Sequence, residues 1–165
     1  MRALTNDQWG FASNCFVCEP TNEAGLRIPF FHDEATDRVT AAFTLDDRFS
    51  GAPSCAHGGV LLAVLDEAMA WAAIAVAHRW AVTGETTTRF EQPVRVGEPY
   101  VVTARITRPP SEGSATLEAE ALIVSADGTA CATAAATFVV LGEAQAADAA
   151  GGALDGAGET YVRSR

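Results

Sequence analysis

The sequence has 165 residues, a length typical of one domain and too short for two substantial ones. Hydrophobic residues make up 48% of the chain and charged residues 19%, so it can bury a core and is not wholly disordered. All eleven basic side chains are arginine, and the net charge of −10 argues against a general nucleic-acid or anionic-membrane binder.

The N-terminal residues MRALTNDQWG contain no apolar segment of the kind found in signal peptides. The longest apolar run, residues 60–77, is interrupted by Asp66 and Glu67, which is typical of a buried helix and not of a membrane span. Four cysteines without an export signal favour reduced thiols. We therefore expect a cytoplasmic protein that does not act on membranes.

In chain order, residues 1–24 are expected to form an irregular N-terminal segment. Two strands are predicted over 26–31 and 38–45, with His32, Asp33 and Glu34 as the turn between them. A loop rich in Ser, Gly and Pro then leads to a helix over residues 58–79.

The second half of the chain has the composition of strands. They are predicted over residues 83–90, 100–107, 115–125 and 129–141, with short turn-forming connections that imply antiparallel neighbours. We expect one domain over residues 25–141, followed by an Ala/Gly-rich tail, residues 142–165, that is mobile or packs only locally.

Apolar residues cover every face of the predicted helix, so an antiparallel sheet is expected to wrap it in an α+β fold. Asp66 and Glu67 are the only ionisable residues in the apolar run. A carboxylate in apolar surroundings is costly unless it is paired or used chemically. Because the two side chains point about 100° apart around the helix, we expect them to lie in different environments.

The sequence His57-Gly58-Gly59 directly precedes the helix. Glycines let a ligand approach the backbone, and the amides of the first helical turn have no acceptor within the helix. Those amides and the helix dipole favour a developing oxyanion. The alternative is a helix start that needs glycine only for packing.

Asp66 follows His57 by nine residues, or roughly 12–14 Å along one helix axis. No substrate atom can lie about 3 Å from both the Asp66 carboxylate and the amides that begin the same helix. If both groups act on one carbonyl, they must come from two antiparallel helices, which predicts a two-fold dimer with shared sites. The alternative for Asp66, and the favoured interpretation for Glu67, is a structural carboxylate.

Cysteine spacing raises the question of a metal. Cys15 and Cys18, together with Cys55 and His57, offer four soft ligands, but only spacing links the two pairs. We therefore expect no metal site, and buried thiols that act as small hydrophobic groups.

Other roles for cysteine and histidine have less support. A nucleophilic pair of Cys55 with a histidine lacks an identifiable third group to orient it. His32 and His78 adjoin charged residues, and both are expected at the surface.

Three segments resemble one family, the hotdog-fold acyl-CoA thioesterases of the PaaI type. They are CFVCEPTNEAGL at 15–26, HGGVLLAVLDEA at 57–68 and RFEQPVRVGE at 89–98. The resemblance extends over residues 15–141 and implies a long helix wrapped by an antiparallel sheet.

The resemblance also implies roles for individual residues. Asp66 matches the family's catalytic carboxylate, acting as a general base or a nucleophile. Gly58, with Gly59 beside it, matches the glycine whose amide polarises the thioester carbonyl, and His57 matches the histidine that shapes that turn. Thr83 lies near a Ser/Thr that positions the attacking water in some members.

One departure is Gly51, where many members have Asn or Gln six residues before the histidine. The expected activity is hydrolysis of an acyl-CoA or acyl-carrier-protein thioester by a homodimer or dimer of dimers. Coenzyme A would be part of the substrate, and no cofactor is expected. A non-catalytic acyl-CoA-binding protein and a dehydratase acting on a thioester are the alternatives.

Overall fold

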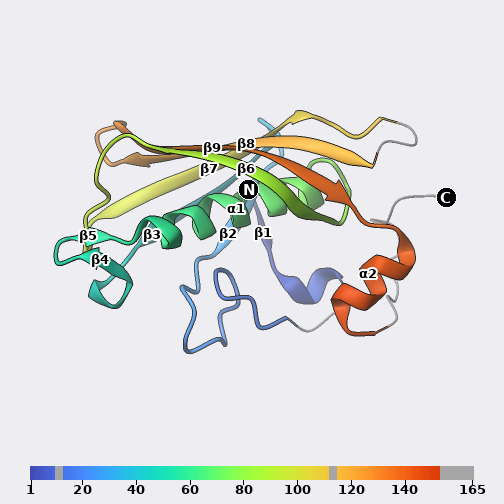
Figure 1. Cartoon of the computed structure of the whole chain (residues 1–165), viewed down its shortest axis with the longest axis horizontal. Coiled ribbons are helices and arrows are strands. Elements are labelled where there is room, and N and C mark those ends of the chain that lie inside the picture. Colours follow the sequence, from blue (N-terminus) through green and yellow to red (C-terminus); the bar gives the residue numbers. More distant parts are fainter. Residues whose placement is uncertain (10–12, 112–114, 153–165) are drawn as a thin grey trace.

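The computed structural model describes residues 1–9, 13–111 and 115–152. Its main element is a seven-stranded antiparallel sheet in the order β1-β2-β3-β7-β8-β9-β6 (Figure 1). The strands are β1 (Arg2–Leu4), β2 (Phe30–Asp33), β3 (Arg38–Thr44), β6 (Ala81–Phe90), β7 (Pro99–Arg108), β8 (Thr116–Ser125) and β9 (Ala130–Val140). A small hairpin of β4 (Ser50–Ala52) and β5 (Cys55–Ala56) precedes the long helix.

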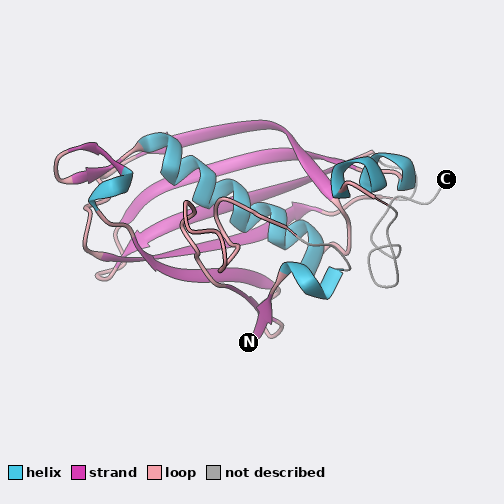
Figure 2. Ribbon diagram, turned by 90° about the horizontal axis from the view of Figure 1, so that it is seen from below, coloured by secondary structure: helices cyan, strands magenta, loops and turns pink. Residues whose placement is uncertain are grey.

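The long helix α1 (Gly58–Ala75) lies along one face of the sheet. The chain that precedes β2 crosses α1 on the side away from the sheet, as Figures 1 and 2 both show. The helix is therefore enclosed from two sides, which explains why it is apolar all round. Its fully buried members include Val64, Leu65, Ala68 and Met69.

Within the described ranges, α1 is the one helix with the length and hydropathy to cross a membrane. Half of its length is buried inside the protein, and it carries Asp66 and Glu67. These features identify α1 as a core helix, as the sequence predicted.

The expected α+β architecture is confirmed, but several boundaries differ. The strand predicted over 26–31 was wrong, because β2 begins at Phe30 and continues through the expected turn to Asp33. The helix ends at Ala75 and not at 79, since His78 adopts a left-handed φ of 52° and the Arg79 amide bonds back to Ala73.

The N-terminal segment contains two regular elements that the sequence did not reveal. Strand β1 extends the sheet beside β2, and a 3-10 helix, η1 (Asn6–Trp9), follows it. A second 3-10 helix, η2 (Asp47–Phe49), precedes β4 and is capped by Asp46.

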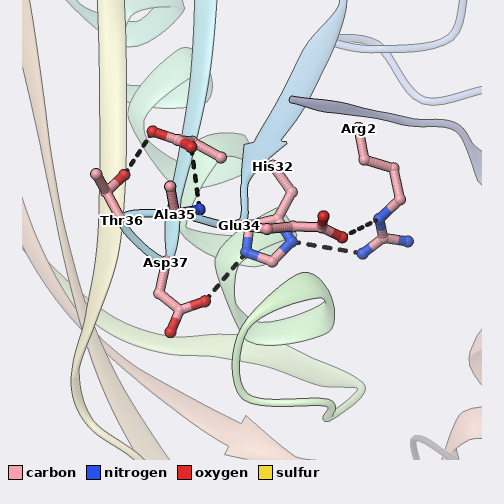
Figure 3. A network of polar contacts seen from close by, with 7 residues as sticks. Arg2, His32, Glu34, Ala35, Thr36 and Asp37 are labelled. Carbon is pink, nitrogen blue, oxygen red and sulfur yellow. Dashed lines mark hydrogen bonds and ion pairs between the residues drawn. The ribbon is translucent and has the colours of Figure 1, made fainter.

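His32 corrects the expectation that it lies at the surface. It is on β2 and only 5% exposed, between the Arg2 guanidinium at 3.4 Å and the Asp37 carboxylate at 3.5 Å (Figure 3). Charged neighbours in sequence do not imply exposure here, because alternation along β2 turns His32 inward while Phe31 and Asp33 face the other way. His78, by contrast, is exposed as expected.

The expected Ala/Gly-rich tail begins with a helix instead, α2 (Glu143–Ala150). Alanine is the strongest helix former, and the Gln145 side chain accepts a hydrogen bond from the Gly142 amide at the helix start. Ala146 is fully buried in the core, so α2 packs on the domain. Residues 153–165 of the expected tail lie outside the described residues.

Candidate active site

Asp66 lies in the third turn of α1, on the side that faces β6. The Thr83 hydroxyl of β6 donates a 2.6 Å hydrogen bond to Asp66 Oδ1. Asp66 Oδ2 accepts no hydrogen bond from the described residues. Asp66 is therefore a half-buried carboxylate in which Thr83 orients one oxygen, while the other oxygen is free to accept a proton.

A β-bulge explains how Thr83 reaches Asp66. Thr86 and Thr88 face α1, so regular alternation would turn Thr83 to the opposite face of the sheet. The register shifts between Thr83 and Glu85, which leaves Gly84 as an extra residue. Thr83 consequently pairs with the buried Phe138 and points toward the helix.

Gly84 also satisfies a steric requirement of this bulge. A Cβ at position 84 would lie 3.1 Å from Val139 Cγ2 and 3.3 Å from the Thr137 carbonyl oxygen. Glycine avoids both close contacts.

The start of α1 is capped by His57. Its Nδ1 accepts a 2.9 Å hydrogen bond from the Gly59 amide, which leaves the imidazole proton on Nε2. A Cβ on Gly59 would lie 3.2 Å from that Nδ1, so glycine permits the close cap. The Gly59 amide is thus already committed to His57.

Gly58 differs from Gly59 both in the hydrogen bonding of its amide and in the space around its Cβ position. The amides of Val60 and Leu61 bond to the His57 carbonyl, whereas the Gly58 amide has no acceptor in the part of the chain that the structure describes. A Cβ on Gly58 would meet only the Phe90 ring, at an ordinary 3.5 Å. The free donor at the start of the helix is therefore Gly58.

A mostly apolar hollow of about 340 Å³ adjoins this donor. Gly58 and Leu61 line it from α1, while Phe90 and Pro93 line it from the end of β6 and the loop that follows. Phe90 is 52% exposed, which is unusual for a phenylalanine and leaves an apolar surface beside the Gly58 amide.

Gly51 packs directly against His57. A Cβ at position 51 would lie 3.0 Å from His57 Cα and 3.2 Å from its Cδ2, so a side chain there would need His57 to shift by a few tenths of an ångström. Glycine at this position therefore allows the close packing against His57.

The Gly58 and Asp66 positions remain apart within one chain. Both belong to the continuous helix α1, so eight residues separate them by about 12 Å along its axis. The structure brings Thr83 to Asp66, and His57 to Gly59, but does not bring these two groups together.

Glu67 faces a second cluster, which the sequence did not predict. The Cys15 thiol and Glu67 Oε1 are 3.4 Å apart, and Cys18 lies beside both. Burial raises the pKa of Glu67 to about 8. Hydrogen bonds from the Cys18 side chain and from nearby backbone amides lower the pKa of Cys15 to about 5.

A larger hollow, about 410 Å³, lies on the opposite face of the sheet from α1. Arg38, Arg89 and Arg105 line it, and Arg105 is paired with Glu120 at 2.6 Å. Thr83 and Asp66 are on the other face, so this hollow is separate from the candidate active site.

Residues 55–132, slightly less than half of the chain, match the family model of the thioesterase superfamily. A crystallised thioesterase superfamily protein aligns with a TM-score of 0.67 and 23% identity over 76% of this chain, but over only 62% of its own length. No functionally curated protein matches the sequence.

Two other solved structures share the fold. PaaI of Escherichia coli, from the phenylacetic acid degradation operon, aligns with a TM-score of 0.62 and 22% identity over 71% of this chain and 81% of PaaI. A hypothetical thioesterase of Streptococcus pneumoniae, solved with coenzyme A, aligns with a TM-score of 0.58 and 16% identity. The alignment covers 62% of this chain and 80% of the pneumococcal protein.

The fold is thus the hotdog fold, a long helix packed on an antiparallel sheet. The family-model match includes the motifs at 57–68 and 89–98 and agrees with the resemblance to the thioesterase superfamily, whereas the motif at 15–26 lies outside it.

Proposed function

We propose that the protein hydrolyses an acyl thioester, carried by coenzyme A or by an acyl carrier protein, to the free acid and the thiol. The observation that carries this proposal is the Thr83–Asp66 hydrogen bond of 2.6 Å on a helix whose one other ionisable residue is Glu67. It supplies a carboxylate oriented for proton transfer or attack where a purely structural helix needs none.

In the proposed reaction, Asp66 removes a proton from water as the water oxygen attacks the thioester carbonyl, or attacks that carbon itself. Thr83 orients the carboxylate. The carbonyl oxygen, as it becomes negative, accepts a hydrogen bond from the free Gly58 amide at the positive end of the helix dipole. The C–S bond then breaks, and the departing sulfur takes up the proton that Asp66 removed from water. If Asp66 attacks instead, breaking of the C–S bond leaves an anhydride on Asp66 and a thiolate that takes a proton from solvent. Water then hydrolyses the anhydride to the free acid and the Asp66 carboxylate.

Because Asp66 and Gly58 of one chain are about 12 Å apart, each proposed site combines Asp66 of one protomer with Gly58 of its partner. The free edge of β6 supports such a dimer. It is ten residues long, whereas β1 at the other edge has three, and exposed Val82 and Phe90 lie on it. Long exposed edges readily pair with another strand.

Two observations on structural neighbours agree with this substrate class. The pneumococcal protein was solved with coenzyme A, and a Streptococcus mutans protein of the same fold was solved bound to acetyl CoA. Two further structures of the pneumococcal protein replace an aspartate and a threonine with alanine, the residue types that form the Asp66–Thr83 pair here.

The test is a panel of short, long and aromatic acyl-CoAs, followed by acyl-carrier-protein thioesters, with release of free thiol as the measurement. We expect turnover of at least one class by the wild-type protein, and its loss in Asp66→Asn. Binding of acyl-CoA without thiol release across the whole panel would identify a non-catalytic binding protein instead.

A further inference from the structure

Three side chains from two distant segments converge below α1, on the side away from the sheet. Cys15 and Cys18 come from the N-terminal loop, and Glu67 comes from the helix. One ligand atom of each, the two sulfurs and a carboxylate oxygen, lie within 4.8 Å of one another. All three residues are half-buried.

The loop is built to hold the first sulfur in place. The backbone amides of Val17 and Cys18 both point at Cys15 Sγ, at 3.3 and 3.5 Å. The Asn6 side-chain amide approaches Cys18 Sγ at 3.5 Å. Amides directed at sulfur stabilise its thiolate form and fix its position before any ligand arrives.

Residues further along the loop brace this arrangement. Asn22 donates to the carbonyl of Asn14, and its own side-chain oxygen accepts from the Ala24 amide. Gly25 is fully packed, and a Cβ there would lie only 2.5 Å from the Phe16 carbonyl oxygen. The turn that carries both cysteines is therefore rigidly specified.

The charge balance of the cluster is unusual. Cys15, Cys18 and Glu67 are all acids, and every donor that reaches them from the described residues is neutral. Within the described residues, no cationic side chain reaches the three acids in this half-buried site. A divalent cation would take the place of the protons.

We propose that Cys15, Cys18 and Glu67 bind one divalent cation of the zinc type, with the fourth position of a tetrahedron left to water. Thiolate and carboxylate oxygen are both ligands that zinc accepts. With Zn–S near 2.3 Å and Zn–O near 2.0 Å, a tetrahedral S–O edge is roughly 3.5 Å. The observed separation of Cys15 Sγ and Glu67 Oε1 is 3.4 Å.

This site is distinct from the Asp66–Thr83 pair, although Asp66 and Glu67 are adjacent. Asp66 faces β6, whereas Glu67, about 100° further around the helix, faces the N-terminal loop. The cation would tie the loop to α1, and its binding would displace any protons that its three ligands still carry. We therefore expect it to act on stability rather than on turnover.

The first experiment measures metal in the full-length protein, purified under reducing conditions without chelator. We expect about one zinc per chain. Added Co²⁺ should give the near-ultraviolet absorption of cobalt–thiolate bonds and the visible bands of a tetrahedral site. Cys15→Ser, Cys18→Ser and Glu67→Gln should each weaken zinc binding by at least tenfold in competition with a chromophoric chelator.

Cys55→Ser is the matched control, because Cys55 is also a half-buried free thiol but lies outside the cluster. It should bind zinc as tightly as wild type. If Cys55→Ser and Cys15→Ser lost zinc affinity equally, the cluster of Cys15, Cys18 and Glu67 would not be the zinc site.

A second measurement on the unmodified chain removes any dependence on how variants fold. Saturating zinc should raise the melting temperature, and a chelator should lower it. If zinc leaves the melting temperature unchanged and the metal content is below a tenth per chain, the proposal is wrong. It is equally wrong if mass spectrometry finds Cys15 and Cys18 joined in a disulfide in protein that takes up no metal, which would indicate a thiol redox site.

Discussion

Asp66 and Glu67 are consecutive carboxylates with different surroundings. The Asp66 side chain accepts a hydrogen bond from Thr83 on β6, and Glu67 contacts Cys15 in the N-terminal loop. A rotation of about 100° per residue separates them. Replacing each acid with its amide preserves shape while removing the charge, so the two positions can be compared directly.

We expect Asp66→Asn to lower kcat by at least about a hundredfold, the usual effect of losing a general base or nucleophile. Glu67→Gln is the control and should change kcat by far less. Steady-state thiol release and circular dichroism of both variants check this prediction. Near-wild-type turnover by a folded Asp66→Asn protein would show that Asp66 is structural.

In the protein without metal, titration of Cys15 and titration of Glu67 change the free energy of unfolding with pH in opposite directions. Burial raises the pKa of Glu67 from 4.5 to about 8, so between those values only the folded chain keeps the proton. The free energy of unfolding therefore falls as pH rises. Hydrogen bonds from Cys18 and from the backbone lower the pKa of Cys15 from 9.0 to about 5, which gives the opposite slope between those values.

In chelator-treated wild-type protein the two slopes should largely offset each other between about pH 5 and 8. Glu67→Gln should leave the Cys15 contribution, so its stability rises with pH over this range. Cys15→Ser should leave the Glu67 contribution, so its stability falls. Urea unfolding at several pH values under reducing conditions measures both, and slopes of the same sign in the two variants would contradict this account.

At the scale of one element, strand β6 carries a bulge at Gly84. Deleting Gly84 would make Thr83 and Glu85 consecutive opposite Phe138 and Thr137, so the ladder would become regular with Thr83 still facing α1. Thr83→Val, in contrast, removes the hydroxyl and with it the Thr83–Asp66 hydrogen bond. We expect Thr83→Val to lower kcat about tenfold, which corresponds to about 1.4 kcal/mol and is typical of one hydrogen bond.

The Gly84 deletion is the matched control for Thr83→Val, since it removes the bulge and keeps the hydroxyl on the α1 side. Both proteins should keep their far-ultraviolet circular dichroism, and the deletion should retain most of the thiol-release activity that Thr83→Val loses. Full activity in Thr83→Val would show that the hydroxyl does not act on Asp66.

Most elements of the sheet and helix could be predicted because their signals are local. The apolar run of α1 predicted a buried helix, and the turn residues between the last strands predicted antiparallel neighbours. Thr83 was identified only through its resemblance to a family position. Counting alternate residues back from Thr86 and Thr88 would have placed it on the wrong face, because one extra residue reverses the pattern.

Other features depend on contacts between segments far apart in the chain. Glu67 is 52 residues from Cys15, so the sequence did not predict their contact, and it gave no support beyond spacing for Cys55 and His57 as partners of the cysteines. The unpartnered hydroxyls of Thr86 and Thr88, buried on the α1 side of β6, were also missed. The sequence does not indicate that the hydroxyls of Thr86 and Thr88 are buried, since burial of a hydroxyl depends on which strands flank it.

At the scale of the whole molecule, the proposed site needs a second copy of the chain, because α1 holds Gly58 and Asp66 about 12 Å apart. Gly58→Pro removes the free amide. The substitution suits the fold, because proline is favoured at the first helical position and the preceding His57 has an extended ψ of 132°. Each parent homodimer, Gly58→Pro or Asp66→Asn, should be inactive.

In a mixed dimer of these two chains, one site has both lesions and the other has neither. Verified heterodimers should therefore recover about half of the wild-type activity per dimer, measured after separation of two differently tagged chains. Inactive heterodimers, or an active species that sediments as a monomer, would exclude the shared site.

The position of β6 also has a consequence for the order of folding. Strand β6 is the first strand of the sheet after α1 in the chain, yet it pairs with β9, some fifty residues further along. Strands β7, β8 and β9 can pair through short turns, whereas closing the longer loop is entropically slower. We expect β6 to dock only after these three strands have paired, as β3 must also do, since its pairing with β7 spans more than fifty residues. A nascent chain would then form neither the proposed dimer edge nor an aligned Thr83 until β9 is in place, so the proposed activity and assembly would begin together.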